Sequence, residues 1–241
     1  MIKRIELNIV DVCNRSCTFC PRGNGYPNTS NHLTYENSFY LKKRLKQYRD
    51  VITISGFGEP LLHKDFERVV SNVLPKNASE IILITNGDYL DDKKYEKIKN
   101  TGITHIRVSL YDEDNSDYFK SFIKDTKLSF NHYYNGPAHE VNRNEIYDKS
   151  GKQTKGKCYL PFYKLFVDYD LKTYLCSNDW SKSVNTGDLK NEPLEDIWYS
   201  NKYNKYRDLL EQGKRKLFPC SNCDICGTLE GESFFNDFRR L

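Results

Sequence analysis

Short apolar runs alternate with helix-like stretches through the first half of the chain, and this alternation restricts the fold more than any other feature. One helix-like stretch begins after Thr34, a residue type that often caps helices. Strands separated by helices of this length predict βα units with a parallel sheet. Five runs are expected to be strands: residues 5–10, 51–55, 80–84, 103–110 and 127–134. A sixth strand is expected near Val141. The chain is therefore expected to be an α/β protein, a partial βα barrel.

Three cysteines, Cys13, Cys17 and Cys20, follow the first apolar run with the spacing C-x3-C-x2-C. Closed zinc sites usually take four ligands in paired C-x2-C units. A four-iron cluster held by three thiolates instead keeps one iron open, and that iron can bind a small chelating molecule. On spacing alone, ordinary reduced cysteines or half of a zinc site remain alternatives.

An aromatic residue, Phe19, directly precedes the last of these cysteines. The resulting pattern, C-x3-C-x-aromatic-C after a strand, resembles the signature of the radical S-adenosylmethionine (SAM) superfamily. The resemblance implies a partial (β/α)6 barrel and a [4Fe-4S] cluster whose open iron is chelated by SAM. It also places Phe19 at the cofactor.

Polar, glycine-containing motifs end the next strands. Glycine lets backbone approach a ligand closely, and βα folds build their sites at the carboxyl ends of strands. Taken alone, these motifs also suit a simple turn or a polar helix cap. The resemblance implies that the first motif contacts the SAM amino group and that the second contacts its ribose and methionyl parts, with a weaker ribose candidate on the fourth strand. The residues are Gly58, Glu59 and Pro60, then Thr85, Asn86 and Gly87, then Ser109.

Five further cysteines lie in the last third of the chain: Cys158, Cys176, Cys220, Cys223 and Cys226. They flank an expected β-hairpin over 165–176 and an expected helix over 194–210. A zinc site with four cysteine ligands is one interpretation. The arrangement resembles the SPASM or twitch extensions of radical SAM enzymes, which implies an auxiliary [4Fe-4S] cluster. The expected ligands of this cluster are Cys158, Cys176, Cys220 and Cys223. Cys226 is expected to be a spare thiol, a substitute ligand or a close neighbour of the cluster.

One residue departs from the SPASM pattern: Leu171 stands where these extensions usually carry glycine. The clearest change of composition is a Lys-, Gly- and Asn-rich segment over 144–157, which is expected to be a linker. The expected domains are therefore a radical SAM partial barrel over 1–145 and a small iron–sulfur domain, a β-hairpin plus helix, over 146–241.

Composition and charge limit which binding partners and which cellular compartment are expected. The net charge is +4, and basic residues are interleaved with acidic ones, so nucleic acid is not expected. No apolar run approaches the roughly 20 residues of a membrane helix, and the N-terminal stretch lacks the apolar core of a signal peptide. A cytoplasmic protein with reduced thiols is expected. The positive charge suits an acidic reductant, a flavodoxin or ferredoxin.

Size and layout resemble the short twitch-type members that dehydrogenate an aminocyclitol alcohol. The resemblance implies that Arg143 reaches the substrate, although an exposed linker charge is the simpler interpretation. It also implies an oxidoreductase in which a deoxyadenosyl radical takes hydrogen from an alcohol carbon and an electron passes to the auxiliary cluster.

Two alternatives remain at this point. A peptide maturase would form a thioether or cross-link, or epimerise a residue, in a ribosomal peptide. Such enzymes often carry an N-terminal recognition domain, and only four residues precede the first apolar run, which favours a small-molecule substrate. A non-catalytic metal-binding scaffold is disfavoured by the motifs on successive strand ends.

Overall fold

The computed structural model describes residues 1–133 and 155–227, with residues 231 and 235. One eight-stranded sheet runs through both expected domains, in the order β5-β4-β3-β2-β1-β6-β7-β8. Neighbouring strands are parallel from β5 to β6 and antiparallel from β6 to β8. The strands are β1 (Arg4–Leu7), β2 (Val51–Ile54), β3 (Glu80–Thr85), β4 (His105–Leu110), β5 (Lys127–His132), β6 (Lys164–Val167), β7 (Lys172–Tyr174) and β8 (Asn185–Asp188).

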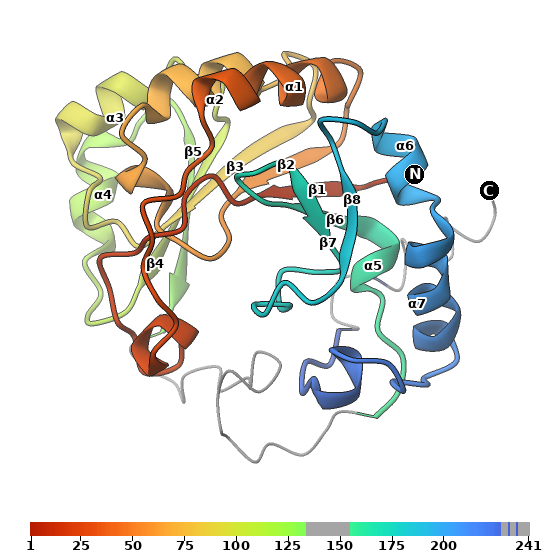
Figure 1. Cartoon of the computed structure of the whole chain (residues 1–241). Coiled ribbons are helices and arrows are strands. Elements are labelled where there is room, and N and C mark those ends of the chain that lie inside the picture. Colours follow the sequence, from red (N-terminus) through yellow and green to blue (C-terminus); the bar gives the residue numbers. More distant parts are fainter. Residues whose placement is uncertain (134–154, 228–230, 232–234, 236–241) are drawn as a thin grey trace.

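Helices follow the strands along the chain. Figure 1 shows α1 to α4 along one side of the curved sheet, and α6 and α7 beside its other end. The α-helices are α1 (Tyr35–Leu45), α2 (Phe66–Val73), α3 (Asp92–Ile98), α4 (Ser116–Phe122), α5 (Leu160–Tyr163), α6 (Leu194–Trp198) and α7 (Asn201–Glu211). The described residues also form the short 3-10 turns η1 (Pro21–Asn24), η2 (Pro60–Leu62) and η3 (Cys220–Asn222). The α/β fold with a partial barrel is confirmed.

Alternation along the strands separates the core from the barrel interior. In β1, Ile5 and Leu7 are buried in the main apolar core, which also contains Leu41 of α1 and Phe66 of α2. Glu6 belongs to a polar group instead and pairs with Lys164 of β6 at 2.7 Å. The two-residue period of a strand therefore places the core under the helices and polar groups on the opposite face.

The first helix begins where its sequence predicts. Thr34 is the N-cap of α1, and its hydroxyl accepts a hydrogen bond from the Asn37 amide at 3.1 Å. Asp91 caps α3 in the same way through the Lys94 amide, at 2.7 Å. Side-chain oxygens at these positions satisfy amides that have no partner within the helix.

Three expectations about the C-terminal half need correction or fall outside the described chain. The continuous helix over 194–210 is wrong: α6 ends at Trp198, and Ser200 caps a separate helix, α7, by accepting from the Tyr203 amide. Because the Ser200 hydroxyl accepts from an amide of α7, it favours the start of a new helix over continuation of α6. The strand near Val141 lies outside the described residues, as does most of the linker over 144–157.

A sixth parallel strand does exist, and it comes from the expected hairpin. β6 pairs in parallel with β1, while β6 and β7 form the antiparallel hairpin that was predicted. At its turn, Leu171 has φ +72° and is fully buried. The left-handed conformation that glycine usually supplies is therefore kept, with the strain of a non-glycine residue offset by burial of its side chain.

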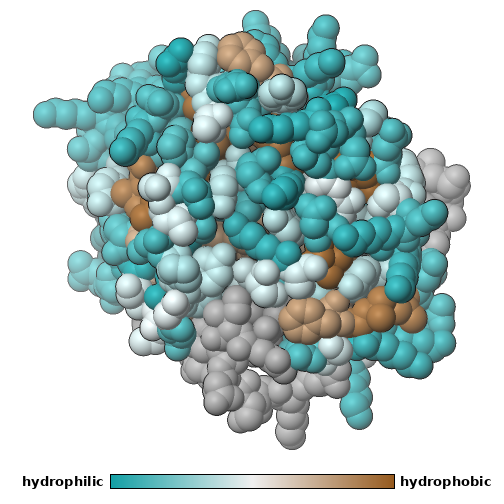
Figure 2. All heavy atoms as spheres, in the orientation of Figure 1, coloured by the Kyte–Doolittle hydropathy of each residue, from teal (hydrophilic) through white to brown (hydrophobic). Residues whose placement is uncertain are grey.

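Most of the face seen in Figure 2 is hydrophilic, with a few apolar side chains among the polar ones. Among the helices of the described chain, none is both long enough and apolar enough to cross a membrane.

Candidate functional site

The first three cysteines lie in the loop that follows β1, just before η1. All three are reduced and partly exposed. Asn28 holds the start of this loop: its side chain accepts from the Cys13 amide at 3.0 Å and donates to the Cys13 carbonyl at 3.2 Å. The Cys20 amide donates to the Cys17 carbonyl at 2.9 Å. The loop is thus ordered by local backbone and side-chain hydrogen bonds while its thiols stay accessible.

A buried arginine anchors the end of the same loop. Arg22 forms an ion pair with Asp11 at 2.7 Å, with both side chains almost fully buried. It also donates to Asn28 Oδ1 at 2.7 Å and to the carbonyl of Phe57. A buried charge is tolerated only when it is paired and hydrogen-bonded, and Arg22 meets both conditions. Removing Arg22 would leave the buried carboxylate of Asp11 without its paired charge.

Gly58 brings the end of β2 onto the cysteine loop. A Cβ at this position would lie 2.6 Å from the Val12 carbonyl oxygen and closer still to that of Val10. The next amide, that of Glu59, donates to the Val12 carbonyl at 2.9 Å. Glycine is required here by contact between two backbone segments, not by ligand binding alone.

Glu59 joins the ends of β2 and β3. Its carboxylate accepts hydrogen bonds from the Thr85 hydroxyl at 2.7 Å, the Asn86 amide at 2.8 Å and the Leu61 amide at 3.1 Å. Its side chain is only 3% exposed, and burial raises its pKa to about 7 despite these donors. Such a carboxylate favours a cation beside it, because a neighbouring positive charge would compensate for burial.

Three stacked aromatic rings form another part of the site. Phe19 of the cysteine loop stacks on Tyr111, with ring centroids 5.6 Å apart, and on Tyr133 at 5.9 Å. The two tyrosines, which follow β4 and β5, stack on each other at 5.1 Å. The stack forms a flat apolar wall against which a planar ring can lie.

These parts surround one cavity of about 410 Å³. The structure therefore brings most of the sequence-predicted site residues together. Its lining includes Cys13, Cys17, Phe19, Cys20, Gly58, Glu59, Thr85, Asn86 and Ser109. Pro60 does not line it and instead begins η2. Arg143 lies outside the described residues.

Ten residues of the lining were not predicted, among them Tyr111, Tyr133, Trp180 and Ile225. The two tyrosines directly follow strand ends, which is a signal that could have identified them. Trp180 comes from the segment between β7 and β8, packs on Phe57 at 4.5 Å between ring centroids and is 5% exposed. No local pattern marks Trp180 or Ile225, because tertiary packing brings them to the cavity.

The remaining cysteines lie before α5, after β7, and in or just after η3. Burial raises the pKa of Cys158 to about 11, with further increases from Cys223 and Cys226. Burial raises the pKa of Cys176 well above its usual range, and Cys223 and Cys220 raise it further. Thiols with raised pKa values form thiolates at neutral pH only beside a compensating cation, which suits a positively charged metal centre.

The spacing of the thiols bears on the kind of metal centre they could hold. Among the described residues, no three His, Cys, Asp or Glu side chains lie close enough to hold a single metal ion. In a four-iron cluster each thiolate binds a different iron, so its ligands stand farther apart than those of one ion. The all-thiol donor sets fit iron–sulfur chemistry, and the individual ligand assignments stay predictions.

Comparison with family models gives two matches. The model described as Radical SAM superfamily matches residues 7–136. A second, described as an iron-sulfur cluster-binding domain (SPASM), matches residues 158–224. The first covers more than half of the chain and contains the cysteine loop and most of the residues that line the cavity. The second contains four of the five remaining cysteines.

Two curated relatives differ in how much of their length aligns with this chain. The S-adenosyl-L-methionine-dependent 2-deoxy-scyllo-inosamine dehydrogenase of Niallia circulans is 24% identical over 242 residues, covering 93% of both chains. A probable GTP 3',8-cyclase of Methanocaldococcus jannaschii is 32% identical over 124 residues, but these cover 51% of this chain and 41% of the cyclase.

Solved structures share the fold. BtrN in complex with AdoMet and 2-DOIA matches with a TM-score of 0.79 and 21% identity, covering 94% of each chain. Native anSMEcpe with bound AdoMet matches with a TM-score of 0.58 and 12% identity, over 98% of this chain and 94% of that one. At these identities the likeness concerns the fold alone.

Proposed function

The chain belongs to the radical SAM superfamily, and from this membership we propose that it oxidises the alcohol carbon of a small sugar or aminocyclitol to a ketone. It is an enzyme of that superfamily, whose cofactors are [4Fe-4S] clusters and SAM. The observation that carries the proposal is the likeness to a dehydrogenase along 93% of both chains. The cyclase match, by contrast, covers about half of this chain.

The cofactors supply one kind of chemistry when bound: the reduced cluster and SAM provide a 5′-deoxyadenosyl radical that abstracts hydrogen. Cys13, Cys17 and Cys20 would hold this cluster. Glu59 is proposed to face the SAM amino group, since its buried carboxylate favours a cation. Phe19 and the two stacked tyrosines would offer their flat wall to the adenine ring. Trp180 lines the cavity from the segment between β7 and β8, where its apolar ring would help to exclude water.

The second thiol group gives the reaction an electron acceptor. Oxidising an alcohol carbon to a ketone removes two electrons and two protons, and abstraction of one hydrogen atom removes only one of each. The remaining proton passes to solvent, and the remaining electron requires an acceptor. We propose that Cys158, Cys176, Cys220 and Cys223 hold that acceptor, an auxiliary [4Fe-4S] cluster. Cys226 has an exposed side chain and is assigned no ligand role.

Three further proposals follow from the same reading of the chain. Arg143 is proposed to contact the substrate. A flavodoxin or ferredoxin is proposed to deliver the electron that starts each turnover, and the enzyme is proposed to work in the cytoplasm. An arginine suits hydroxyl-rich substrates because its guanidinium presents several donors in a fixed plane.

The test uses protein reconstituted with iron and sulfide without oxygen. Incubation with dithionite, SAM and 2-deoxy-scyllo-inosamine is expected to yield 5′-deoxyadenosine and ketone in equal amounts, with about eight irons per chain. Zinc without iron, and no deoxyadenosine, would overturn the proposal. Deoxyadenosine accompanied by a modified peptide, with no oxidised polyol, would replace the dehydrogenase by a peptide maturase. A Cys226→Ala variant should keep both the iron content and the ketone yield.

A further inference from the structure

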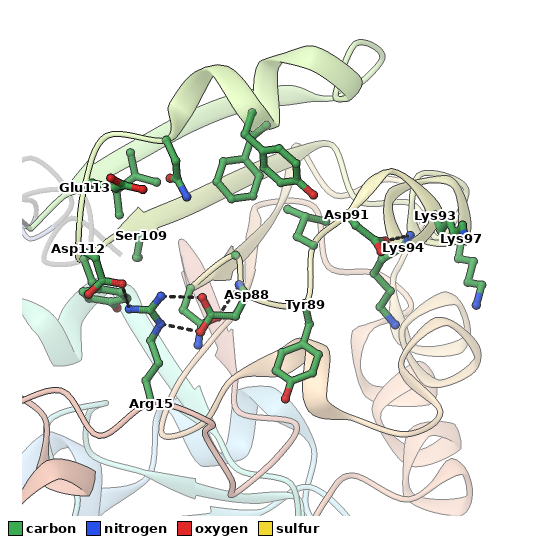
Figure 3. Close-up of a pocket in the computed structure, with 18 residues that line it drawn as sticks. Arg15, Asp88, Tyr89, Asp91, Lys93, Lys94, Lys97, Ser109, Asp112 and Glu113 are labelled. Atoms are coloured by element: carbon green, nitrogen blue, oxygen red, sulfur yellow. Dashed lines mark hydrogen bonds and ion pairs between the residues drawn. The ribbon is translucent and has the colours of Figure 1, made fainter.

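An arginine inside the cysteine loop has no part in the proposed reaction, yet it is tightly held. Arg15 lies between Cys13 and Cys17, and its guanidinium forms a two-point contact with Asp88: Nε and Nη2 each donate to a carboxylate oxygen at 2.6 Å. Nη1 donates to Asp112 at 2.8 Å. Figure 3 shows the guanidinium reaching toward both carboxylates. These three residues, Arg15, Asp88 and Asp112, are called the Arg15 clamp below.

The clamp joins three segments that are distant in sequence. Asp88 follows β3 directly after the Thr85–Asn86–Gly87 turn, and Asp112 follows β4. Asn14 strengthens the link, since its side chain donates to Asp88 at 2.6 Å and accepts from Asn86 at 2.9 Å. The segment between the first two cysteines is therefore fastened to the same turn that lines the SAM cavity.

The two carboxylates differ in environment. The Arg15 and Asp88 side chains are 23% and 29% exposed, whereas that of Asp112 is 75% exposed. A two-point contact between arginine and carboxylate is directional and stronger than a single bond, and an exposed ion pair contributes little. Asp88 is thus expected to be the main partner. Hydrogen bonding to Arg15 also lowers the pKa of Asp88, although burial opposes this.

Arg15 also supports the aromatic wall. Its guanidinium carbon lies 5.3 Å from the centroid of the Tyr111 ring, which stacks on Phe19. Arg15, Asn86, Ser109 and Tyr111 line both the SAM cavity and a second cavity of about 540 Å³ beside it. With three nitrogens donating to carboxylates, the guanidinium is occupied within the protein, which argues for a structural link to the site over direct binding of a substrate.

We propose that Arg15 is a positioning residue: through its two-point contact with Asp88 it fixes the cysteine loop, and with it the cluster and Phe19, against the turn that receives SAM. This inference rests on the proposed use of the loop as the cluster site. Loss of the contact should let the loop shift relative to that turn. SAM would then bind more weakly, and its cleavage would be less often coupled to substrate oxidation.

The experiment compares reconstituted Arg15→Gln, Arg15→Lys, Asp88→Asn and Asp112→Asn enzymes with the wild type. Arg15→Gln and Asp88→Asn should each weaken SAM affinity about tenfold and lower the ratio of ketone to deoxyadenosine. Arg15→Lys should restore part of the loss, because it keeps the charge without the planar donors. Asp112→Asn should change affinity less than about threefold. The electron paramagnetic resonance spectrum of the reduced cluster should respond less fully to SAM in the first two variants.

Lys99→Gln is the matched control, since Lys99 forms an ion pair with Glu96 at 2.7 Å beside α3 and lines neither cavity. Unchanged affinity, coupling and spectrum in Arg15→Gln would overturn the inference. A lower melting temperature with those three readouts unchanged would do the same, because it would leave Arg15 only a folding role. If the wild type itself forms no deoxyadenosine, the proposed function fails instead.

Discussion

Glu59 allows a quantitative test of how the site is built. Its carboxylate is almost fully buried, and its pKa is raised from an ordinary 4.5 to about 7, chiefly by burial. The folded chain therefore holds a proton on this group at pH values where the unfolded chain has released it. The stabilisation from that proton is fully present below the unfolded pKa and is lost as pH rises through the folded pKa.

The size of the effect follows from the shift. A pKa raised from 4.5 to about 7 corresponds to about 3 kcal/mol of unfolding free energy over the whole window. Most of it should be lost between about pH 5 and about pH 8, and the rest has already disappeared at the lower pH. Glu59→Gln removes the titrating group while keeping the shape of the side chain. The unfolding free energy of this variant should therefore lack the pH-dependent part that comes from Glu59.

The assay is urea unfolding of the metal-free, reduced chain at several pH values in wild type and Glu59→Gln. Subtracting the two curves cancels every other titrating group. The wild type should lose about 2 to 3 kcal/mol relative to the variant on going from about pH 5 to about pH 8. The variant carries a constant penalty of about 1–3 kcal/mol, because an amide cannot accept all three hydrogen bonds. A difference that stays constant with pH would refute the pKa shift and the burial that explains it.

Other predictions concern SAM binding, the two thiol groups and the C-terminal packing. In the reconstituted enzyme, SAM affinity measured by anaerobic calorimetry should rise with pH up to about 7, as Glu59 ionises, and Glu59→Gln should flatten that dependence. Cys17→Ala should abolish deoxyadenosine formation and lower the iron content by about four per chain. Cys176→Ala should keep deoxyadenosine formation while losing most of the ketone; full ketone yield would contradict an electron-accepting role for the second group. Gly187→Ala should lower the unfolding free energy by about 1–3 kcal/mol, because its Cβ would lie 2.5 Å from Ile197 Cγ1 in a buried contact.

Local patterns predicted much of the fold because they carry their own physical cause. Thr34 was predicted as a cap, and it accepts the hydrogen bond that such a cap makes. The run over 51–55 was predicted as a strand, and β2 occupies Val51–Ile54. Around the cavity, Gly58 and Glu59 follow a strand end, where βα folds build their sites, but it was the resemblance to radical SAM enzymes that identified them as SAM contacts.

Long-range packing was not predictable in the same way. The pairing of β6 with β1 joins segments about 160 residues apart, and no short window of sequence contains both partners. Trp180 reaches the cavity through contacts with Phe57, which belongs to a different part of the chain. The break before α7 could have been predicted from Ser200, but the apolar face continues across it and favoured one long helix.

The register of the sheet explains how two thiol groups can serve one reaction. Leu7 at the end of β1 is opposite both Ile54 of β2 and Val167 of β6. The chain after Leu7 enters the cysteine loop, and after Val167 it enters the hairpin that leads to Cys176. Because β7 runs antiparallel to β6, the chain then turns back along β6, and Cys176 lies toward the start of β6, away from the cysteine loop. The separation between the radical source and the proposed electron acceptor is thus set by the pairing of β1 with β6 and of β6 with β7. This makes that separation a property of the folded sheet, independent of the length of chain that connects the two matched families.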